Sequence, residues 1–412
     1  MRRFRIRLVL AFVLVLLALF LRADSLFIGP VGLLTLPYQF SLWTWEVKNF
    51  PAKWLYWPLE TLPWRRLSAE ERRALVRDYF ATAREAWWLT AMAQRGVAPS
   101  TPEQARQARE RLVSLQEKMG ALRPRVEEAL EAELSALLQE EGLTRRIGPF
   151  SLLWPPVDIR FDTLPKFLAL SPRDRIVLQG GVLLRGDISL NEVVALENRI
   201  YRQYNLSAVV VDLGGLATYP AILSPFYGPV QVAEAMAHEW VHHYLYFYPL
   251  GRAYYTDPEM RALNETVADL VGKELGRRLY ARLGFPPIVA GGGGTGGARE
   301  PDFATQTLRE TRRRVEELLA QGKVEEAEGY MEQQRVALAR WGYYLRKLNQ
   351  AYFAFHGSYA ESPASINPLG EQVRQVWTQA GSVGKFLEAV RGISRLEQFQ
   401  ALLQRTGGPA GS

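Results

Sequence analysis

Long stretches of the chain carry apolar residues at every third or fourth position, a pattern that predicts amphipathic helices. Residues 68–71 (SAEE) form a capping box, which opens a helix predicted to reach about Gln94. Residues 101–119 and 123–141 are predicted to form a helical hairpin with its turn near Gly120, because glycine weakens a helix interior.

The middle of the chain changes to short apolar runs separated by proline and glycine, which are typical of β-strands. Such runs lie at 157–161, 164–170 and 175–184. Residues 190–204 return to a helical pattern, and the apolar run 207–212 predicts a buried strand. We therefore expect an α+β fold that is mostly helical, with a small mixed β-sheet and flanking helical hairpins.

The last part of the chain is predicted to be helical again. Residues 302–321 and 324–351 have the charged, amphipathic pattern of a second hairpin, which turns at Gly322. The following residues, 352–370, break this pattern, and residues 371–405 resume it.

The amino-terminal residues predict a membrane anchor. The apolar run 8–21 follows four arginines, and no small-residue cleavage site lies nearby, which favours an uncleaved signal anchor. The arginines should stay in the cytoplasm, so the catalytic part is expected outside it. Residues 25–45 are uncharged and interrupted by proline, and tryptophans continue to residue 64. Contact with the membrane interface, packing under the soluble part and a second span all remain open for this segment.

These patterns divide the chain into six regions. They are a signal-anchor or transmembrane segment (1–24), an aromatic and interfacial segment (25–66), a helical hairpin region (67–145), an α/β core (146–285), a glycine-rich flexible loop (286–300) and a helical carboxyl-terminal region (301–412).

Composition excludes several kinds of site. The chain has no cysteine, so disulfides, cysteine-bound zinc and a cysteine nucleophile are excluded. The net charge is +7, but no basic patch is interleaved with stacking aromatics, so we expect no nucleic-acid partner. Nothing in the sequence indicates an oligomeric state.

The run QVAEAMAHEWVHHYLYFY carries the strongest chemical signal. It predicts a helix on which His238 and His242 are four residues apart and therefore share one face. Two imidazoles so placed can bind one cation. Glu239 lies beside them, where it can reach a water molecule as a general base.

A second helical stretch supplies the acidic partners. A catalytic zinc ion takes three protein ligands and leaves a fourth position open, and Glu265 fits the third ligand. Asp269 lies four residues later on the same face, where it fits a carboxylate that orients a ligand histidine. His243 is rotated away from the metal face and is expected to lie behind it or at the surface.

Together these residues resemble the gluzincin metallopeptidases, the thermolysin-like class. In that class the third ligand is a glutamate in an N-E-x-x-[AS]-D segment, which Asn264, Glu265, Ala268 and Asp269 match. The resemblance covers about residues 205–275 and implies one Zn²⁺ per chain, with Asn264 and Asp269 behind the ligands.

The resemblance also implies a substrate strand. Gluzincins place an edge strand before the metal-binding helix, and a substrate peptide pairs with it. Residues 213–219 occupy that place here, and an ordinary turn after a core strand is the alternative. The substrate-binding candidates in this segment are Gly214, Gly215, Ala217 and Tyr219.

Thermolysin-like enzymes further use a histidine or tyrosine from a carboxyl-terminal helical region to stabilise the oxyanion. His356 is the one histidine outside the metal-binding helix, and Tyr359 follows it. Both are candidates for this role, and Tyr254 and Tyr255 between the metal-binding helices are weaker ones.

The sequence thus predicts a membrane-anchored zinc metallopeptidase that acts on peptide or protein substrates. Endopeptidase and aminopeptidase activity both fit. The alternative is a membrane-bound helical scaffold or interaction protein whose zinc site is structural or vestigial.

Overall fold

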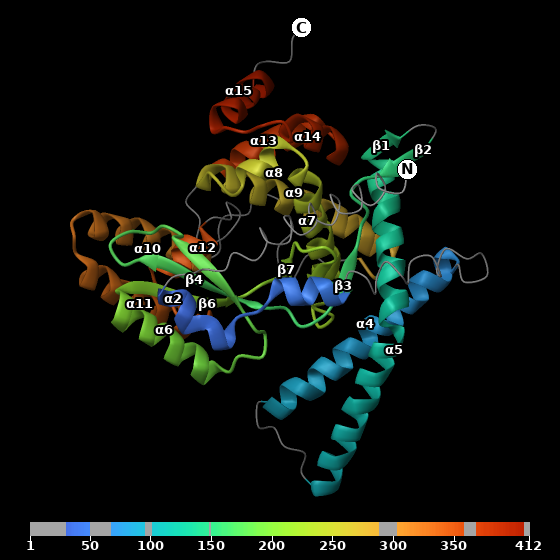
Figure 1. Ribbon diagram of the computed structural model, residues 1–412, viewed down its shortest axis with the longest axis horizontal. Helices are drawn as coiled ribbons and strands as arrows, with labels where there is room; N and C mark the ends of the chain where they lie inside the picture. Colours follow the sequence, from blue (N-terminus) through green and yellow to red (C-terminus); the bar gives the residue numbers. More distant parts are fainter. Residues whose placement is uncertain are drawn as a thin grey trace, which may run out of the picture.

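The computed structural model describes residues 30–49, 67–94, 101–147, 150–287, 303–357 and 368–407. Its helices are α2 (Pro30–Thr35), η1 (Leu36–Tyr38), α4 (Ala69–Gln94), α5 (Pro102–Glu140), α6 (Leu190–Tyr204), α7 (Pro229–Tyr246), α8 (Pro249–Ala253), α9 (Pro258–Arg282), α10 (Phe303–Ala320), α11 (Val324–Arg340), α12 (Gln350–His356), α13 (Leu369–Ala380), α14 (Val383–Val390) and α15 (Leu396–Gly407). Its strands are β1 (Thr144–Ile147), β2 (Phe150–Leu153), β3 (Ile159–Phe161), β4 (Lys166–Pro172), β5 (Gly180–Leu184), β6 (Leu206–Asp212), β7 (Gly215–Leu216) and β8 (Ala221–Leu223). The predicted α+β class is confirmed (Figure 1).

Several predictions fall outside these residues. The anchor at 1–24, most of the aromatic segment and nearly all of the glycine-rich loop are not described. Among the helices of the described ranges, none combines the length and the apolar character needed to cross a membrane.

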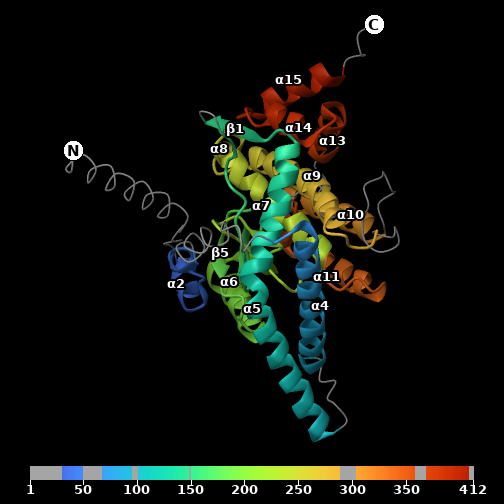
Figure 2. The same cartoon turned by 90° about the vertical axis from the view of Figure 1, so that its right-hand side faces the viewer.

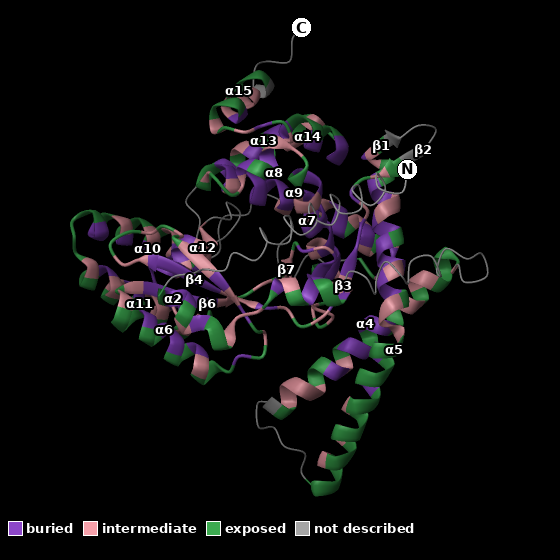
Figure 3. Ribbon diagram, viewed as in Figure 1, coloured by how far each residue is buried: buried purple, intermediate pink, exposed green. Residues whose placement is uncertain are grey.

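The helical hairpin forms differently from the prediction. Helix α5 is continuous through Gly120 and Pro124, so the predicted turn at Gly120 is wrong, and the two arms of the hairpin are α4 and α5 (Figure 2). One buried stripe runs from Leu115 and Met119 on to Val126 and beyond, and its packing outweighs the weak helix propensity of glycine and proline. The amino-terminal half of α5 is mostly exposed, as the green colouring shows (Figure 3).

Two small sheets replace the single sheet that was expected. One has the antiparallel strand order β5-β4-β6, with α6 packed against β6. The other is mixed and has the order β3-β8-β7, in which β3 is parallel and β7 antiparallel to β8. A separate hairpin, β1 and β2, precedes both. The predicted helix at 190–204 and the strand at 207–212 are confirmed.

Three of the four outer edges of these two sheets are covered by other parts of the chain. The edge of β5 hydrogen-bonds to residues 38–40, and that of β6 to Glu197 and to residues 346–351. On the mixed sheet, Glu127 and Glu131 of α5 accept the N–H groups of β3 at 2.8 and 2.7 Å. The remaining edge, β7, has no strand paired to its outer side among the described residues.

The largest core surrounds α7 and α9, which pack against each other over most of their length. Residues of α4, α5, α13 and α14 join this core, whereas α6 and the β5-β4-β6 sheet form a second one. The sequence regions 67–145 and 146–285 therefore do not correspond to separate cores, because the apolar face of the hairpin is buried on the metal-binding helices.

The carboxyl-terminal helices end earlier than expected. Helix α11 stops at Arg340 rather than near residue 351, and residues 352–356, expected to break the helical pattern, belong to α12 (Gln350–His356). The side chain of Asn349 caps α12 by accepting from the N–H of Tyr352, which explains the new start. Helix α12 packs on β4 and β6 of the antiparallel sheet.

Candidate metal centre

Two helices bring three ligand atoms to one point. The Nε2 atoms of His238 and His242, both on α7, are 3.0 Å apart. Each lies 3.5 Å from Oε2 of Glu265, which is on α9. These three residues are the one group with metal-ligand chemistry found in the described part of the chain, and their ligand atoms lie within 4.8 Å of one another.

Glycines on α9 allow this close approach of the helices. A Cβ added at Gly272 would lie 3.0 Å from the Cβ of His238, and one added at Gly276 would lie 2.6 Å from the backbone nitrogen of Glu234. Larger residues at either position would push α9 away from α7. Gly272 and Gly276 therefore help to set the distance between Glu265 and the two histidines.

Each histidine is oriented by a polar side chain of α9 at its other ring nitrogen. Asp269 Oδ1 lies 3.1 Å from Nδ1 of His238, and Asn264 Oδ1 lies 2.8 Å from Nδ1 of His242. Both oxygens accept a hydrogen bond from Nδ1–H, so in the neutral rings each Nε2 keeps its lone pair for a metal ion. The sequence placed Asn264 and Asp269 behind the ligands, and the structure puts them there.

The arrangement has the dimensions of a zinc site. Zinc bonds to histidine nitrogen and carboxylate oxygen are about 2.0–2.2 Å, so ligand atoms at tetrahedral angles lie about 3.4 Å apart. The observed separations of 3.0, 3.5 and 3.5 Å are close to this value. Glu265 Oε2 is buried and has no hydrogen-bond partner, an expensive state that a bound cation would relieve. The residues therefore fit a zinc ion.

Glu265 is held in place by a tyrosine. The hydroxyl of Tyr254, at the end of α8, donates to Oε1 of Glu265 at 2.7 Å, and its ring centroid lies 6.0 Å from that of His242. This contact leaves Oε2 of Glu265 directed at the histidines. Tyr254 was a weaker candidate in the sequence, and the structure places it in direct contact with the centre.

The charges of the centre favour cation binding. Burial raises the pKa of Glu265, but the two histidines outweigh burial and hold this pKa well below its usual range. Burial lowers the pKa of His238, and the nearby carboxylates of Asp269 and Glu265 reverse the direction, so the net shift is upward. A cation can replace the protons that these groups otherwise hold.

Glu239 faces the backbone of β7. Its side chain is 6 % exposed, and burial raises its pKa, although the two histidines oppose this shift. A Cβ added at Gly215 would lie 2.4 Å from Oε1 of Glu239, so a larger residue at this position would force either Glu239 or the strand to shift. The open edge of the mixed sheet thus runs beside the predicted general base.

The other residues predicted to bind substrate are placed as follows. Gly214 and Ala217 are exposed on either side of β7. Tyr219 turns away, since its hydroxyl donates to Pro156 O at 3.2 Å and its ring lies against His243. Burial lowers the pKa of His243 to about 4, which makes it a neutral packing group behind the ligands.

Of the two residues predicted to stabilise the oxyanion, only His356 lies within the described residues, and it packs away from the metal-binding group. His356 lies on α12, and its ring packs on Tyr352 and Phe355, with centroid distances of 4.3 and 5.2 Å. It makes no ring contact, hydrogen bond or ion pair with the metal-binding group in the described part of the chain. Tyr359 lies outside the described residues.

Comparisons of the chain with protein families, curated proteins and solved structures found no match. What the chain does is therefore inferred from its own side chains. The relevant ones are three convergent ligand atoms, two groups that orient the histidines and a buried carboxylate beside an open strand edge.

Proposed function

We propose that this chain is a zinc-dependent peptidase in which His238, His242 and Glu265 hold the metal and Glu239 is the general base. One observation carries the proposal: the ligand atoms converge within 4.8 Å of one another, next to a buried carboxylate, Glu239, that contacts Gly215 of the open strand β7. A purely structural metal site does not require a buried carboxylate such as Glu239 beside the ligands.

The ligand set supports zinc as the metal. Two imidazole nitrogens and one carboxylate are typical of catalytic zinc, which keeps a fourth position for water or substrate. A zinc ion bound there would polarise a carbonyl group and lower the pKa of its bound water to about 7.

In this proposal Glu239 carries out the proton transfers, and Asp269 and Asn264 fix the protonation of the two histidines. Glu239 takes a proton from the attacking water and passes it to the leaving amine. Asp269 and Asn264 keep the ring nitrogens of His238 and His242 in the protonation state that metal binding needs.

The strand edge supplies the binding surface for the substrate. An extended peptide can add to β7 through backbone hydrogen bonds, which recognise a peptide without regard to its side chains. The opposite edge of this sheet is not available, since Glu127 and Glu131 already bind the N–H groups of β3. A peptide on β7 would pass next to Gly215 and therefore next to Glu239.

Tyr254 has a positioning role in this proposal. Its hydroxyl fixes Oε1 of Glu265 and leaves Oε2 for the metal. Its single proton could be donated to an oxyanion only if the hydroxyl released Oε1, for example after Glu265 has bound the metal through Oε2. Residues 1–24 would anchor the protein in a membrane, with the peptidase outside the cytoplasm.

The proposal is tested by hydrolysis of a fluorescence-quenched peptide library. We expect activity in the wild type that is removed by a zinc chelator and restored by added zinc. The Glu239→Gln variant should keep its zinc and lose at least about a hundredfold of the rate. Glu274→Gln, the same change at a partly exposed site of α9, is the control and should keep the wild-type rate. Unchanged hydrolysis in Glu239→Gln would exclude Glu239 as the base.

A further inference from the structure

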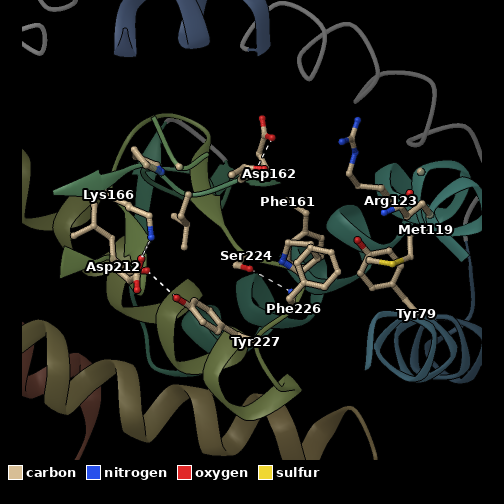
Figure 4. Close-up of a pocket in the computed structure, with 18 residues that line it drawn as sticks. Tyr79, Met119, Arg123, Phe161, Asp162, Lys166, Asp212, Ser224, Phe226 and Tyr227 are labelled. Carbon is tan, nitrogen blue, oxygen red and sulfur yellow. Dashed lines mark hydrogen bonds and ion pairs between the residues drawn. The ribbon is translucent and has the colours of Figure 1, made fainter. Parts of the chain in front are cut away.

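A cavity of about 420 Å³ lies where the helical hairpin meets the mixed sheet (Figure 4). Its volume falls within the range of about 300–1,000 Å³ that is typical of ligand pockets. Its walls come from α4, α5, the end of β3, the segment before β7 and the segment after β8. The proposed zinc site does not include any of these lining residues.

The cavity is continuous in sequence and space with the open strand. Leu213, which lines it, lies two residues before Gly215, the position that touches Glu239. The hydroxyl of Tyr227 donates to the carbonyl oxygen of Leu213 at 3.0 Å and so fixes the entry to β7. An extended peptide that follows β7 toward its amino end therefore arrives at the cavity within a few residues of the reacting bond.

The walls of the cavity are mainly apolar and aromatic. Five of its larger side chains are Tyr79 of α4, Met119 of α5, Phe161 at the end of β3, and Phe226 and Tyr227 in the segment after β8. Figure 4 shows Phe226 and Tyr227 on one side, with Tyr79 and Met119 on another.

The charged groups of the cavity are already paired with other side chains. Lys166 forms an ion pair with Asp212, and Asp162 accepts from the indole N–H of Trp45 at 2.9 Å. Arg123 lies 3.9 Å from the carboxylate of Glu127. Because the larger lining side chains are apolar or aromatic, and Lys166 and Asp212 neutralise each other, the cavity favours an apolar ligand over an ionic one.

We infer that this cavity is a specificity pocket that receives a large apolar side chain, such as phenylalanine, from a peptide bound along β7. The inference rests on the proposed function, since that proposal places the peptide on this strand. In this inference the helical hairpin helps to bind substrate, because α4 and α5 supply one wall of the pocket. Peptides with a bulky apolar residue at one fixed distance from the cleaved bond are the substrate class.

The test measures binding separately from cleavage. A series of alanine-rich peptides, each with one phenylalanine moved by one position, is titrated calorimetrically into the full-length Glu239→Gln protein. We expect phenylalanine at one position to improve affinity by about tenfold or more over alanine, as burial of an aromatic side chain would give. The same peptides are then offered to the wild type to measure cleavage.

Two substitutions in the pocket have matched controls elsewhere. Gly120→Trp places a large side chain at the wall of the cavity, and an added Cβ there meets no atom within 4 Å. Gly329→Trp makes the same change at an equally open site on α11. Phe226→Ala removes one wall, and Phe303→Ala removes a phenylalanine of similar exposure, 50 % against 45 %.

The pocket substitutions should abolish most of the gain from phenylalanine, and the control substitutions should retain it. The same gain in all four variants would overturn the assignment of the cavity. A folded Glu239→Gln protein that binds none of the peptides would also overturn it. If the peptides bind in the expected pattern but the wild type does not cleave them, the proposed reaction is wrong and the pocket stands.

Discussion

The backbone of Gly215 lies against the carboxylate of Glu239, so that a Cβ at position 215 would be 2.4 Å from Oε1. This contact joins the edge of a three-stranded sheet to the helix that carries two of the metal-binding residues. It predicts that Gly215→Ala displaces either Glu239 or β7. We expect the peptidase rate to fall by about tenfold to a hundredfold while bound zinc is retained, because a small misplacement of a catalytic group is costly.

Gly214→Ala is the comparison for this variant. An added Cβ at Gly214 meets no atom within 4 Å, so its effect on the rate should be much smaller. The test compares the two variants in their rate of hydrolysis of one peptide and in their zinc content. Equal losses in the two variants would mean that the contact with Glu239 is not the cause.

The groups behind the histidines should control metal affinity. Asp269→Ala removes the partner of His238 Nδ1 and should weaken zinc binding by about tenfold to a hundredfold, measured by competition with a chelator. Glu274→Gln, five residues further along α9, should bind zinc as the wild type does. Unchanged affinity in Asp269→Ala would show that His238 does not need this carboxylate.

Tyr254→Phe separates the hydroxyl of this residue from its ring. The variant should remain folded, since the ring still packs near His242, but Glu265 Oε1 loses its donor. If the hydroxyl also acts on the oxyanion, kcat should fall by about tenfold or more while KM changes little. A loss confined to zinc affinity would limit Tyr254 to holding Glu265.

His356 should make stability depend on pH rather than support catalysis. Burial lowers its pKa from 6.5 to about 4, so the folded protein resists protonation while the unfolded chain accepts it. The stabilisation is present above pH 6.5 and is lost as the pH falls toward 4. The free energy of unfolding, measured with a metal chelator present, should fall with decreasing pH between 6.5 and 4 less steeply in His356→Gln than in the wild type. The two slopes should differ by up to about 1.4 kcal/mol per pH unit.

Urea titrations at several pH values between 7 and 4.5 give this difference in slope. The variant should also keep its peptidase activity at pH 7, which tests the alternative that His356 is catalytic. A large loss of kcat with unchanged stability would restore the role in oxyanion stabilisation.

The sequence identified the residues that lie on regular helices. His238 and His242 converge because a spacing of four places them on one face of α7, and the same rule places Glu265 and Asp269 on one face of α9. These expectations needed no knowledge of tertiary contacts, beyond the assumption that the two helices pack together.

The sequence could not identify what depends on distant pairing. Strand β3 pairs with β8, and strands β4, β5 and β6 and helix α6 lie between them in the sequence, so the separate mixed sheet was visible only in the fold. An edge strand at residues 213–219 was expected only from the resemblance to gluzincins. Gly120 looked like a turn because its propensity is poor, but the buried stripe of α5 carries the helix through it. Tyr254 gave no pattern of its own and reached Glu265 through the short loop after α8.

The measurement that tests the central claim most directly is the zinc content of the full-length protein by mass spectrometry, beside that of Glu265→Gln. We predict close to one zinc ion per chain in the wild type and little or none in the variant, because Glu265 Oε2 is the third ligand. A folded wild-type protein without zinc, or a variant that keeps its zinc, would contradict the account. The first of these results would favour a scaffold protein with a vestigial site.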